Sequence, residues 1–396
     1  MALDFQQIRE QVRQLGEKAP LREQRLKELR ELACSLLKGN ARRTEELSLK
    51  VQEVVRSHDP TLRCALPVSE ALDDHFSQPE PPLQATVLAA DGSQIAPDRH
   101  AEIEYGLINV GVIGMVYGSA APPVTTASTH LFYDEDLYTA TGMMSDALLA
   151  LRRDLNERTM LAQQAAQAIP PVIAFTDGLM EIYASKELVG EEASEFQKSL
   201  TEYLEVLFQM QSLGVITAGY VDKPGTTLVV RLLEVAMISE ADFSEIKKFR
   251  PLRGVYDIDL YKDLLHPGER SPVFAVQSPS SKVYTGSLSL HFFYLNVGGP
   301  GHPSLSRIEI PAWVAENQAM LDTLHAVVVD QCRVMGPKPY PYLLHRAHET
   351  ALVSLQEKEQ ITAMIAQELR RRGVNVGEQS QKQANKELPG RTRYAG

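Results

Sequence analysis

The segment Leu83-Gln-Ala-Thr-Val-Leu-Ala-Ala90 is a short apolar run that stops at Asp91-Gly92, a dipeptide typical of turns. The same pattern of an apolar strand followed by an aspartate occurs again at residues 172–177 and 215–222. Because ligands of open α/β sheets bind where the carboxyl ends of the strands meet, we expect the three aspartates to lie near one another. The pattern therefore predicts an α/β fold with carboxylates gathered at one edge of its sheet.

Further strands and helices are expected on both sides of this segment. Two strands and a helix are predicted at 105–117, 128–133 and 146–168, and strands and helices then alternate at 172–176, 193–213, 215–221 and 226–237. The last third is irregular at 240–285, and it then predicts strands at 287–297 and 307–310 and helices at 311–335 and 342–371. Three strands close together, followed by alternating helices and strands, predict a mixed sheet flanked by helices.

The two ends of the chain differ in texture from its middle. Apolar residues recur at three- and four-residue steps over residues 1–56, which predicts helices that pack on the main domain or on a second copy. Residues 57–83 are rich in Pro, Ser and Asp and read as a connector. We therefore expect a helical extension and linker over 1–83 and one main domain over 84–372. The tail at 373–396 has almost no large apolar residue and is expected to be disordered.

Composition limits the class of protein. The 396 residues are 44% hydrophobic and 23% charged, which is typical of globular proteins. Lys and Arg total 40 against 51 Asp and Glu, so the formal net charge of −11 argues against a wholly basic, histone-like nucleic-acid binder. A local basic groove stays compatible with this charge, because phosphate binding depends on local contacts.

Cysteine usage and the N-terminus indicate a cytoplasmic location. The three cysteines, Cys34, Cys64 and Cys332, are scattered and form no CxxC pair, so the sequence supports neither a zinc knuckle nor a disulfide framework. The first residues lack the charged-then-apolar pattern of a signal peptide. No apolar stretch reaches the ~20 residues that a membrane-spanning helix needs.

The three strand-ending aspartates carry the functional prediction. Taken alone, each is explained by a turn, because a carboxylate that leaves a strand often caps the next turn. Held close together, like charges repel and raise each other's pKa unless a cation neutralises them, and hard divalent ions with oxygen ligands meet that need. Two such ions can hold a scissile phosphate and activate an attacking water. The pattern therefore favours phosphodiester hydrolysis at an acidic metal site.

Six short motifs, taken in order, resemble one family. They are Ala89-Ala-Asp91-Gly-Ser-Gln94, Leu107-Ile-Asn-Val-Gly111, Thr176-Asp177-Gly-Leu179, Ala218-Gly-Tyr220, Arg307-Ile-Glu-Ile-Pro-Ala-Trp313 and Tyr340-Pro-Tyr-Leu-Leu-His-Arg-Ala-His348. Together they resemble the NurA nucleases, over about residues 84–360. The resemblance implies an RNase H-like domain, a homodimer, and Mn²⁺- or Mg²⁺-dependent cleavage of DNA as a 5′-to-3′ exonuclease and single-strand endonuclease. It also implies a partner, a HerA-type hexameric translocase, in the processing of DNA double-strand breaks.

The resemblance also assigns site residues. It places metal ligands on the first strand, the first long helix and the fourth strand, and Asp91 and Asp177 occupy the two strand positions. The acids of the predicted helix are Asp146, Asp154 and Glu157, and the family pattern selects Glu157, which lies 20 residues before Asp177. An exposed helix residue paired with a neighbouring arginine is the plain alternative for Glu157.

The family also uses a histidine near the C-terminus, and here its motif falls on His348, as a metal ligand or proton carrier. His345 lies three residues earlier and ranks second, because residues three apart share a helix face. Asp222 and Lys223 have weaker support: Lys223 is a candidate for a phosphate contact, while a turn before Pro224 explains both residues.

The DNA-binding surface stays unassigned by the sequence. Candidates are Arg99 and His100 after the first motif, and the basic C-terminal residues Arg370, Arg371, Arg372, Lys382, Lys386, Arg391 and Arg393. A solvated surface explains such residues equally well.

Other classes of protein remain open from the residues alone. A dehalogenase-type phosphatase requires a second aspartate two residues after the first, where this chain has Ser93. An actin-like ATPase requires two glycine-rich phosphate hairpins, and only the first motif comes close to one. The chain has no Walker A motif, so it cannot itself supply an ATP-driven motor. A non-catalytic NurA-like adaptor that binds and regulates the translocase is the alternative outside enzymology.

Overall fold

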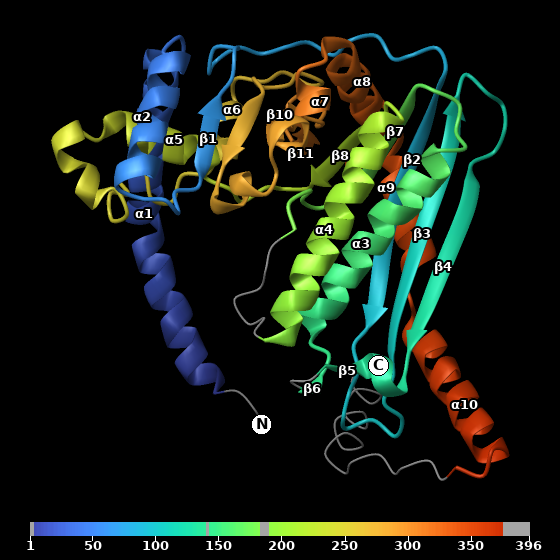
Figure 1. Ribbon diagram of the computed structural model, residues 1–396. Helices are drawn as coiled ribbons and strands as arrows, with labels where there is room; N and C mark the ends of the chain where they lie inside the picture. Colours follow the sequence, from blue (N-terminus) through green and yellow to red (C-terminus); the bar gives the residue numbers. More distant parts are fainter. Residues whose placement is uncertain (1–3, 140–141, 183–189, 375–396) are drawn as a thin grey trace. The chain divides into compact units, whose positions relative to one another are not determined.

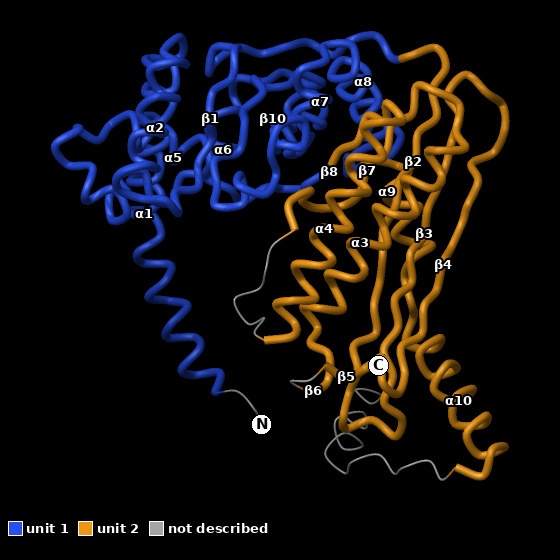
Figure 2. The backbone as a smooth tube through the Cα atoms, in the orientation of Figure 1, with its two compact units in different colours: residues 1–81, 219–340 blue, residues 82–218, 341–396 orange. Residues whose placement is uncertain are grey.

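The structure is a computed structural model that describes residues 4–139, 142–182 and 190–374. The chain forms two compact units, of which unit 1 comprises residues 1–81 and 219–340 and unit 2 comprises residues 82–218 and 341–396 (Figure 2). The chain passes from unit 2 into unit 1 within strand β8 (Ile216–Val221). No helix in the described ranges is long and apolar enough to cross a lipid bilayer.

Unit 2 is built on a mixed sheet whose strands lie in the order β7-β2-β3-β4. Strands β2 (Ala85–Ile95), β3 (Gly106–Tyr117) and β4 (Val124–Phe132) follow one another as an antiparallel meander (Figure 1). Strand β7 (Val172–Asp177) returns after a helix and pairs parallel to β2. Three antiparallel strands with the fourth strand parallel to the first form the expected RNase H-like mixed sheet, so the predicted fold class is confirmed.

Helices cover both faces of this sheet. Helices α3 (Asp146–Ala165) and α4 (Glu191–Ser212) lie in front of the strands and α9 (Tyr342–Ala351) lies behind them (Figure 1). Helix α3 begins where the Ser145 hydroxyl accepts a hydrogen bond from the Leu148 amide, as expected of an N-cap serine. Burial of α3 leucines against the sheet then stabilises the helix by about 1.5–3 kcal/mol for each side chain that is fully buried.

Unit 1 contains the N-terminal helices and a second group of strands. Its strands lie in the order β1-β9-β10-β11-β8, each antiparallel to its neighbour. These strands are β1 (Cys64–Pro67), β9 (Phe274–Gln277), β10 (Leu290–Asn296) and β11 (Leu305–Pro311). The helices are α1 (Phe5–Gly39), α2 (Thr44–Ser57), α5 (Leu228–Met237), α6 (Asp257–Tyr261), α7 (Ala312–Ala315) and α8 (Gln318–Val334).

Several short elements complete the chain. Strands β5 (Tyr138–Thr139) and β6 (Gly142–Met143) pair with each other, and the 3₁₀ segments are Asp134–Leu137, Glu240–Glu245, Pro279–Lys282 and Gly286–Leu288. Helix α10 (Leu355–Arg371) follows α9. Its Ile361 and Ile365 pack on a cluster that includes Tyr105 and Leu107.

The predicted run of strands and helices in the middle of the chain agrees with the structure, and four local expectations were wrong. Strand β2 does not stop at Asp91-Gly92 but continues to Ile95, because it stays paired with β3 as far as Ile95 opposite Leu107. The connector at 57–83 contains strand β1. The helices expected at 311–335 and 342–371 are each two helices, interrupted at residues 316–317 and 352–354.

The units divide the chain differently from the expected domains at one point. The sequence places residues 219–340 in the main domain, whereas in the structure they pack with the N-terminal helices in unit 1. The unit boundary after residue 81 lies close to the predicted linker end at 83. Within the predicted tail only residues 373–374 belong to the described part of the chain, so the expectation of disorder falls outside it.

Candidate functional site

Asp91 and His348 are in direct contact in unit 2. Asp91 lies in the middle of β2, and His348 is carried by helix α9. The Nδ1 atom of His348 lies 2.6 Å from Oδ2 of Asp91, and the other carboxylate oxygen accepts the Gly92 amide at 2.9 Å. The Asp91 side chain is 16% exposed and that of His348 is 59% exposed. The aspartate is therefore mostly buried in the sheet, and the histidine is accessible to solvent.

Helix α9 reaches this position because strand β3 carries a glycine beneath it. Gly111 pairs with Asp91 across the sheet. A Cβ atom at Gly111 would lie 2.7 Å from Cβ of Thr350 and 2.9 Å from the carbonyl oxygen of Ala347. Such distances are shorter than real Cβ contacts, so the close approach of α9 requires glycine here. The Leu107–Gly111 motif therefore has a packing role behind the Asp91–His348 pair.

Two polar side chains hold the C-terminal end of α9 on the sheet. Asn109 donates to the carbonyl oxygens of Ala351 at 2.8 Å and Thr350 at 3.3 Å, and the Ser93 hydroxyl also donates to Ala351. Thr129 in turn donates to the Asn109 amide oxygen at 2.7 Å. These bonds satisfy carbonyls that a helix end leaves without intrahelical partners, and they fix the helix that presents His348.

Glu157 approaches the same strand from helix α3, on the other face of the sheet. Its Oε1 atom lies 2.7 Å from where a Cβ of Gly92 would be, so Glu157 packs directly against the residue after Asp91. Glu157 is 7% exposed. Burial raises its pKa well above the ordinary value, the charges of Asp154 and Asp91 raise the pKa further, and Arg153 opposes the shift.

Arg153 pairs with two of the acids of helix α3. Its guanidinium lies 2.7 Å from Asp154 and 3.4 Å from Glu157. Burial also raises the pKa of Asp154, against the opposing charge of Arg153. Asp154 and Glu157 thus share one cationic side chain. Glu157 is therefore a buried acid beside β2 that pairs with Arg153, so the alternative was right about the arginine partner and wrong about exposure, while the role of metal ligand stays a prediction.

Asp177 comes into line with Asp91 through the strand register. In the parallel pair of β2 and β7, Ala90 lies opposite Thr176, and continuation of this register by one residue places Asp177 beside Asp91. Asp177 is exposed at the end of β7, where it lines a cavity of about 420 Å³. Asp154 and Glu157 line the same cavity.

The sequence reasoning missed Glu181, a further acid that lines this cavity. Glu181 is 4% exposed and lies four residues after Asp177, beyond the Asp-Gly turn. The sequence signal that could have identified Glu181 is its position as a second carboxylate shortly after the Asp177-Gly178 dipeptide at the end of a strand. It carried no periodic pattern that would mark it as buried.

The remaining predicted residues have the following places in the structure. His345 is bound to Glu349, with its Nε2 atom 3.4 Å from Oε1 of that residue. Asp222 and Lys223 belong to unit 1, whereas Asp91, Glu157, Asp177 and His348 all belong to unit 2. Asp146 lies in the first turn of α3.

The candidate basic residues lie on the surface where they are described. Arg99 and His100 are exposed in the loop after β2. Arg370 pairs with Glu102 at 3.3 Å, and Arg371 and Arg372 both pair with Glu368. The four candidates Lys382, Lys386, Arg391 and Arg393 lie outside the described residues.

The donor set fits a divalent metal ion by its chemistry. Over the described ranges, no group of three or more His, Cys, Asp or Glu side chains is spaced closely enough to hold a metal ion. Arg153 instead supplies the positive charge between two of the acids. Carboxylate oxygens are the ligands that Mg²⁺ and Mn²⁺ prefer. The acids of unit 2 therefore offer ligands of the kind that a hard divalent cation prefers, although the described residues do not bring three of them close enough to hold one, and Arg153 supplies a counter-charge to two of them.

The fold defines an RNase H-like class of protein, and candidate acids lie on the first strand, the first long helix and the fourth strand. Within that class, the chain belongs to the NurA domain family, whose sequence pattern it matches over residues 85–353. The resemblance inferred from the six motifs is thereby confirmed, and family membership supports a nuclease. A comparison with curated protein sequences finds no match.

Three solved structures illustrate the structural similarity. A NurA structure with manganese shares 11% sequence identity with a TM-score of 0.36, covering 86% of this chain and 97% of that one. Endonuclease V from Ciona intestinalis, in complex with a 24mer DNA, shares 9% identity with a TM-score of 0.30, covering 81% and 99%. The catalytic domain of human endonuclease V shares 14% identity with a TM-score of 0.32, covering 81% and 98%. Such TM-scores describe partial overlap, so the family assignment rests on the sequence match.

One family motif lies in unit 1. Arg307 and Glu309 of the Arg307–Trp313 motif lie on strand β11 in unit 1, where they form an ion pair. Their exposures are 1% and 0%. Breaking a buried pair of this kind leaves an uncompensated charge in the interior, so we interpret the motif as part of the core of unit 1.

Proposed function

We propose that this protein is a divalent-metal-dependent deoxyribonuclease whose catalytic site is formed by Asp91, Glu157, Asp177 and His348. The contact between Asp91 and His348 carries the proposal, because it joins a strand acid to a histidine from a distant helix. The register that brings Asp177 beside Asp91 supports it further. A buried structural pair is the competing explanation, and the 59% exposure of His348 argues against it.

The residues divide the chemistry between them. Asp91, Glu157 and Asp177 would hold the ions, and we propose two ions, Mn²⁺ or Mg²⁺. When bound, such ions polarise the scissile phosphate and lower the pKa of an attacking water. His348 hydrogen-bonds Asp91 through Nδ1, so in its neutral form it donates from that nitrogen and presents Nε2 as an acceptor. Nε2 then takes up or returns a proton, or serves as a metal ligand.

The substrate and partners follow from the family resemblance. We propose DNA as substrate, with 5′-to-3′ exonuclease and single-strand endonuclease activity in the processing of double-strand breaks. The partner would be a HerA-like hexameric ATPase, as the family resemblance implies, and it would supply the ATP-driven motor for which this sequence has no Walker A motif. We further propose a homodimer that works in the cytoplasm.

The direct test is cleavage of 5′-labelled single- and double-stranded DNA with Mn²⁺. Asp91→Ala is expected to abolish cleavage, whereas Asp136→Ala, which removes an exposed acid of the same unit, is expected to leave it unchanged. Equal activity of wild type and Asp91→Ala, or activity that persists in EDTA, would overturn the proposal. Binding to the translocase without any cleavage by the wild type would instead support the adaptor function.

A further inference from the structure

A cavity of about 620 Å³ in unit 1 is lined by more basic than acidic side chains. Lys223 follows strand β8, His302 lies in the loop between β10 and β11, and Lys338 follows helix α8. Asp222 is the one acid among the residues that line it. With both lysines charged, the lining carries a positive charge even when His302 is neutral.

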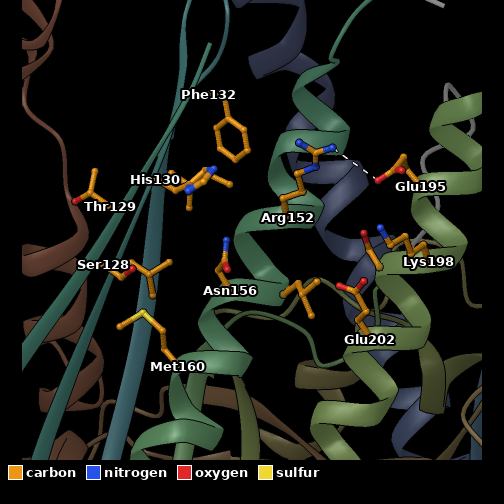
Figure 3. Close-up of a pocket in the computed structure, with 14 residues that line it drawn as sticks. Ser128, Thr129, His130, Phe132, Arg152, Asn156, Met160, Glu195, Lys198 and Glu202 are labelled. Atoms are coloured by element: carbon orange, nitrogen blue, oxygen red, sulfur yellow. Dashed lines mark ion pairs between the residues drawn. The ribbon is translucent and has the colours of Figure 1, made fainter. Parts of the chain in front are cut away.

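Two other cavities differ from this one in charge. The cavity between β4, α3 and α4 contains Arg152 and Lys198, which are balanced by Glu195 and Glu202, and Arg152 already lies 3.7 Å from Glu195 (Figure 3). The cavity that Glu157 and Asp177 line, without Asp91 or His348, is acidic. For a chain of net charge −11, an anionic ligand needs a local excess of positive charge, and the unit 1 cavity provides one.

The backbone around the lysines is held in place. Asn296, which is 1% exposed, accepts hydrogen bonds from the amides of Gly298 and Ser304 at 3.0 and 3.2 Å and so closes the loop that contains His302. A Cβ at Gly298 would lie 2.2 Å from the His302 carbonyl oxygen, so only glycine fits there. Lys223 itself has a φ of +46°, a conformation that residues with side chains rarely adopt. The cavity is therefore a preformed feature.

An aromatic side chain completes the lining. Tyr340 lines the cavity, and its ring packs edge-on against Tyr220, with ring centroids 5.4 Å apart. Sites that follow single-stranded nucleic acid combine positive side chains for the backbone with aromatic rings for the bases. Lysine binds phosphate as a flexible point charge, which suits contacts that do not depend on sequence.

We propose that this cavity binds backbone phosphodiester groups of single-stranded DNA, through Lys223 and Lys338, with Tyr340 in contact with a neighbouring base. The inference rests on the proposed function, because DNA is the substrate proposed above. It goes beyond it by assigning a DNA-binding site in unit 1, outside the four candidate catalytic residues. These contacts would involve phosphates other than the one that is hydrolysed.

The test measures binding of a fluorescent single-stranded oligonucleotide by anisotropy in EDTA, across a series of salt concentrations. Loss of two phosphate contacts is expected to lower the slope of log K against log salt by about 1.4, because each contact contributes about 0.7 for single strands. We expect this for the full-length double variant Lys223→Gln/Lys338→Gln. The matched control is Lys248→Gln/Lys282→Gln, which removes two exposed lysines of the same unit away from the cavity.

Further arms separate the outcomes. Lys223→Arg/Lys338→Arg should retain the wild-type slope, which excludes a general folding defect as the cause of a change. Equal slopes for both glutamine double variants would overturn the proposal, as would absence of DNA binding by the wild type. An effect confined to 5′-phosphorylated oligonucleotides would place the terminal phosphate in the cavity and overturn backbone binding. Failure of the proposed nuclease function would appear separately, as DNA binding with this slope change but no cleavage in Mn²⁺.

Discussion

The imidazole of His348 touches the carboxylate of Asp91, with Nδ1 and Oδ2 2.6 Å apart, although 257 residues separate the two in sequence. Neither residue occupies this position by virtue of its own local sequence. Asp91 lies inside β2 because the strand continues through the Asp91-Gly92 dipeptide without a turn. Helix α9, which carries His348, can approach the sheet because position 111 is a glycine. The pair is thus a product of the packing of unit 2.

Replacement of His348 by alanine should separate a catalytic histidine from a structural one. A positioned proton carrier contributes about 10²–10⁴-fold to a rate, so we expect Mn²⁺-dependent cleavage by His348→Ala to fall by that factor. His345→Ala should cleave DNA at nearly the wild-type rate, because His345 pairs with Glu349. DNA binding in EDTA should be unchanged in both variants. Equal losses of activity in the two would contradict the assignment to His348.

Gly111→Ala tests the close approach of helix α9. The added methyl would lie 2.7 Å from Thr350, so α9 must shift. Overpacking of this kind costs about 1–3 kcal/mol, which is measured as a lower midpoint of urea unfolding, and displacement of His348 should also reduce cleavage. Gly225→Ala is the control, because nothing lies within 4 Å of a Cβ there. If both variants unfold at the same urea concentration, the packing argument fails.

The Arg153→Gln variant should depend more strongly on a bound metal ion for its stability than the wild type does. The variant removes the cation shared by Asp154 and Glu157, so stability in EDTA should fall by on the order of 1 kcal/mol. The uncompensated acids should then bind Mn²⁺ about tenfold more tightly, since about 1.4 kcal/mol corresponds to a factor of ten. The readout is the Mn²⁺ concentration that half-maximally raises the Tm.

The control for this variant is Arg152→Gln, which removes the neighbouring arginine that faces Glu195 instead. We expect its Mn²⁺ dependence to match that of the wild type. A weaker response to Mn²⁺ in Arg153→Gln would show that Arg153 does not act as a stand-in for the metal charge.

Asp257 gives unit 1 a pH-dependent stability. Its carboxylate accepts hydrogen bonds from the amides of Leu228 and Val230 and from the Tyr294 hydroxyl, and burial raises its pKa from 3.8 to about 6. A raised carboxyl pKa means that the folded state binds the proton more tightly than the unfolded state does. Stability from this group is therefore full below pH 3.8 and is lost as pH rises through 6.

The measurement compares urea unfolding of the wild type and Asp257→Asn at pH values between about 4 and 7, which span the two pKa values of the carboxyl. Because a tenfold difference in proton affinity corresponds to about 1.4 kcal/mol, the wild type should lose about 3 kcal/mol more than the variant over this range. The variant should be less stable overall at the acidic end, because an amide cannot accept all three hydrogen bonds. Parallel pH profiles for the two proteins would exclude a raised pKa for Asp257.

The periodic parts of the fold could be predicted from the sequence. Apolar runs in the sequence predicted β2, β3, β7 and β8, and helical spacing of apolar residues predicted the helices between them. In such long segments the pattern of apolar residues indicates which face is buried. Strands β1 and β9 are four residues each and carry no such pattern. The break between α9 and α10 also lacked a strong local signal, since residues 352–354 contain neither glycine nor proline.

The candidate site was predicted less evenly. The rule that strand ends converge predicted that Asp91, Asp177 and Asp222 gather, but Asp91 lies within β2 and not at its end, and only continuation of the β2–β7 register places Asp177 next to it. The Asp91-Gly92 dipeptide indicated a turn, because from sequence alone a glycine required by a packed helix looks the same as a glycine required by a turn. The roles of the four residues in catalysis stay predictions until the variants are measured.

Gly92 and Gly111 have a consequence for how this enzyme tolerates change. The missing side chain at Gly92 lets Arg153 and Glu157 of α3 pack on one face of the sheet, and the missing side chain at Gly111 lets the backbone of α9 approach the other face (Figure 1). Exchanges of core hydrophobic residues that conserve volume usually cost less than about 1.5 kcal/mol. In a saturation mutagenesis library of unit 2, we therefore expect active variants with many different residues at most core positions. At positions 92 and 111 we expect almost no active variant other than glycine.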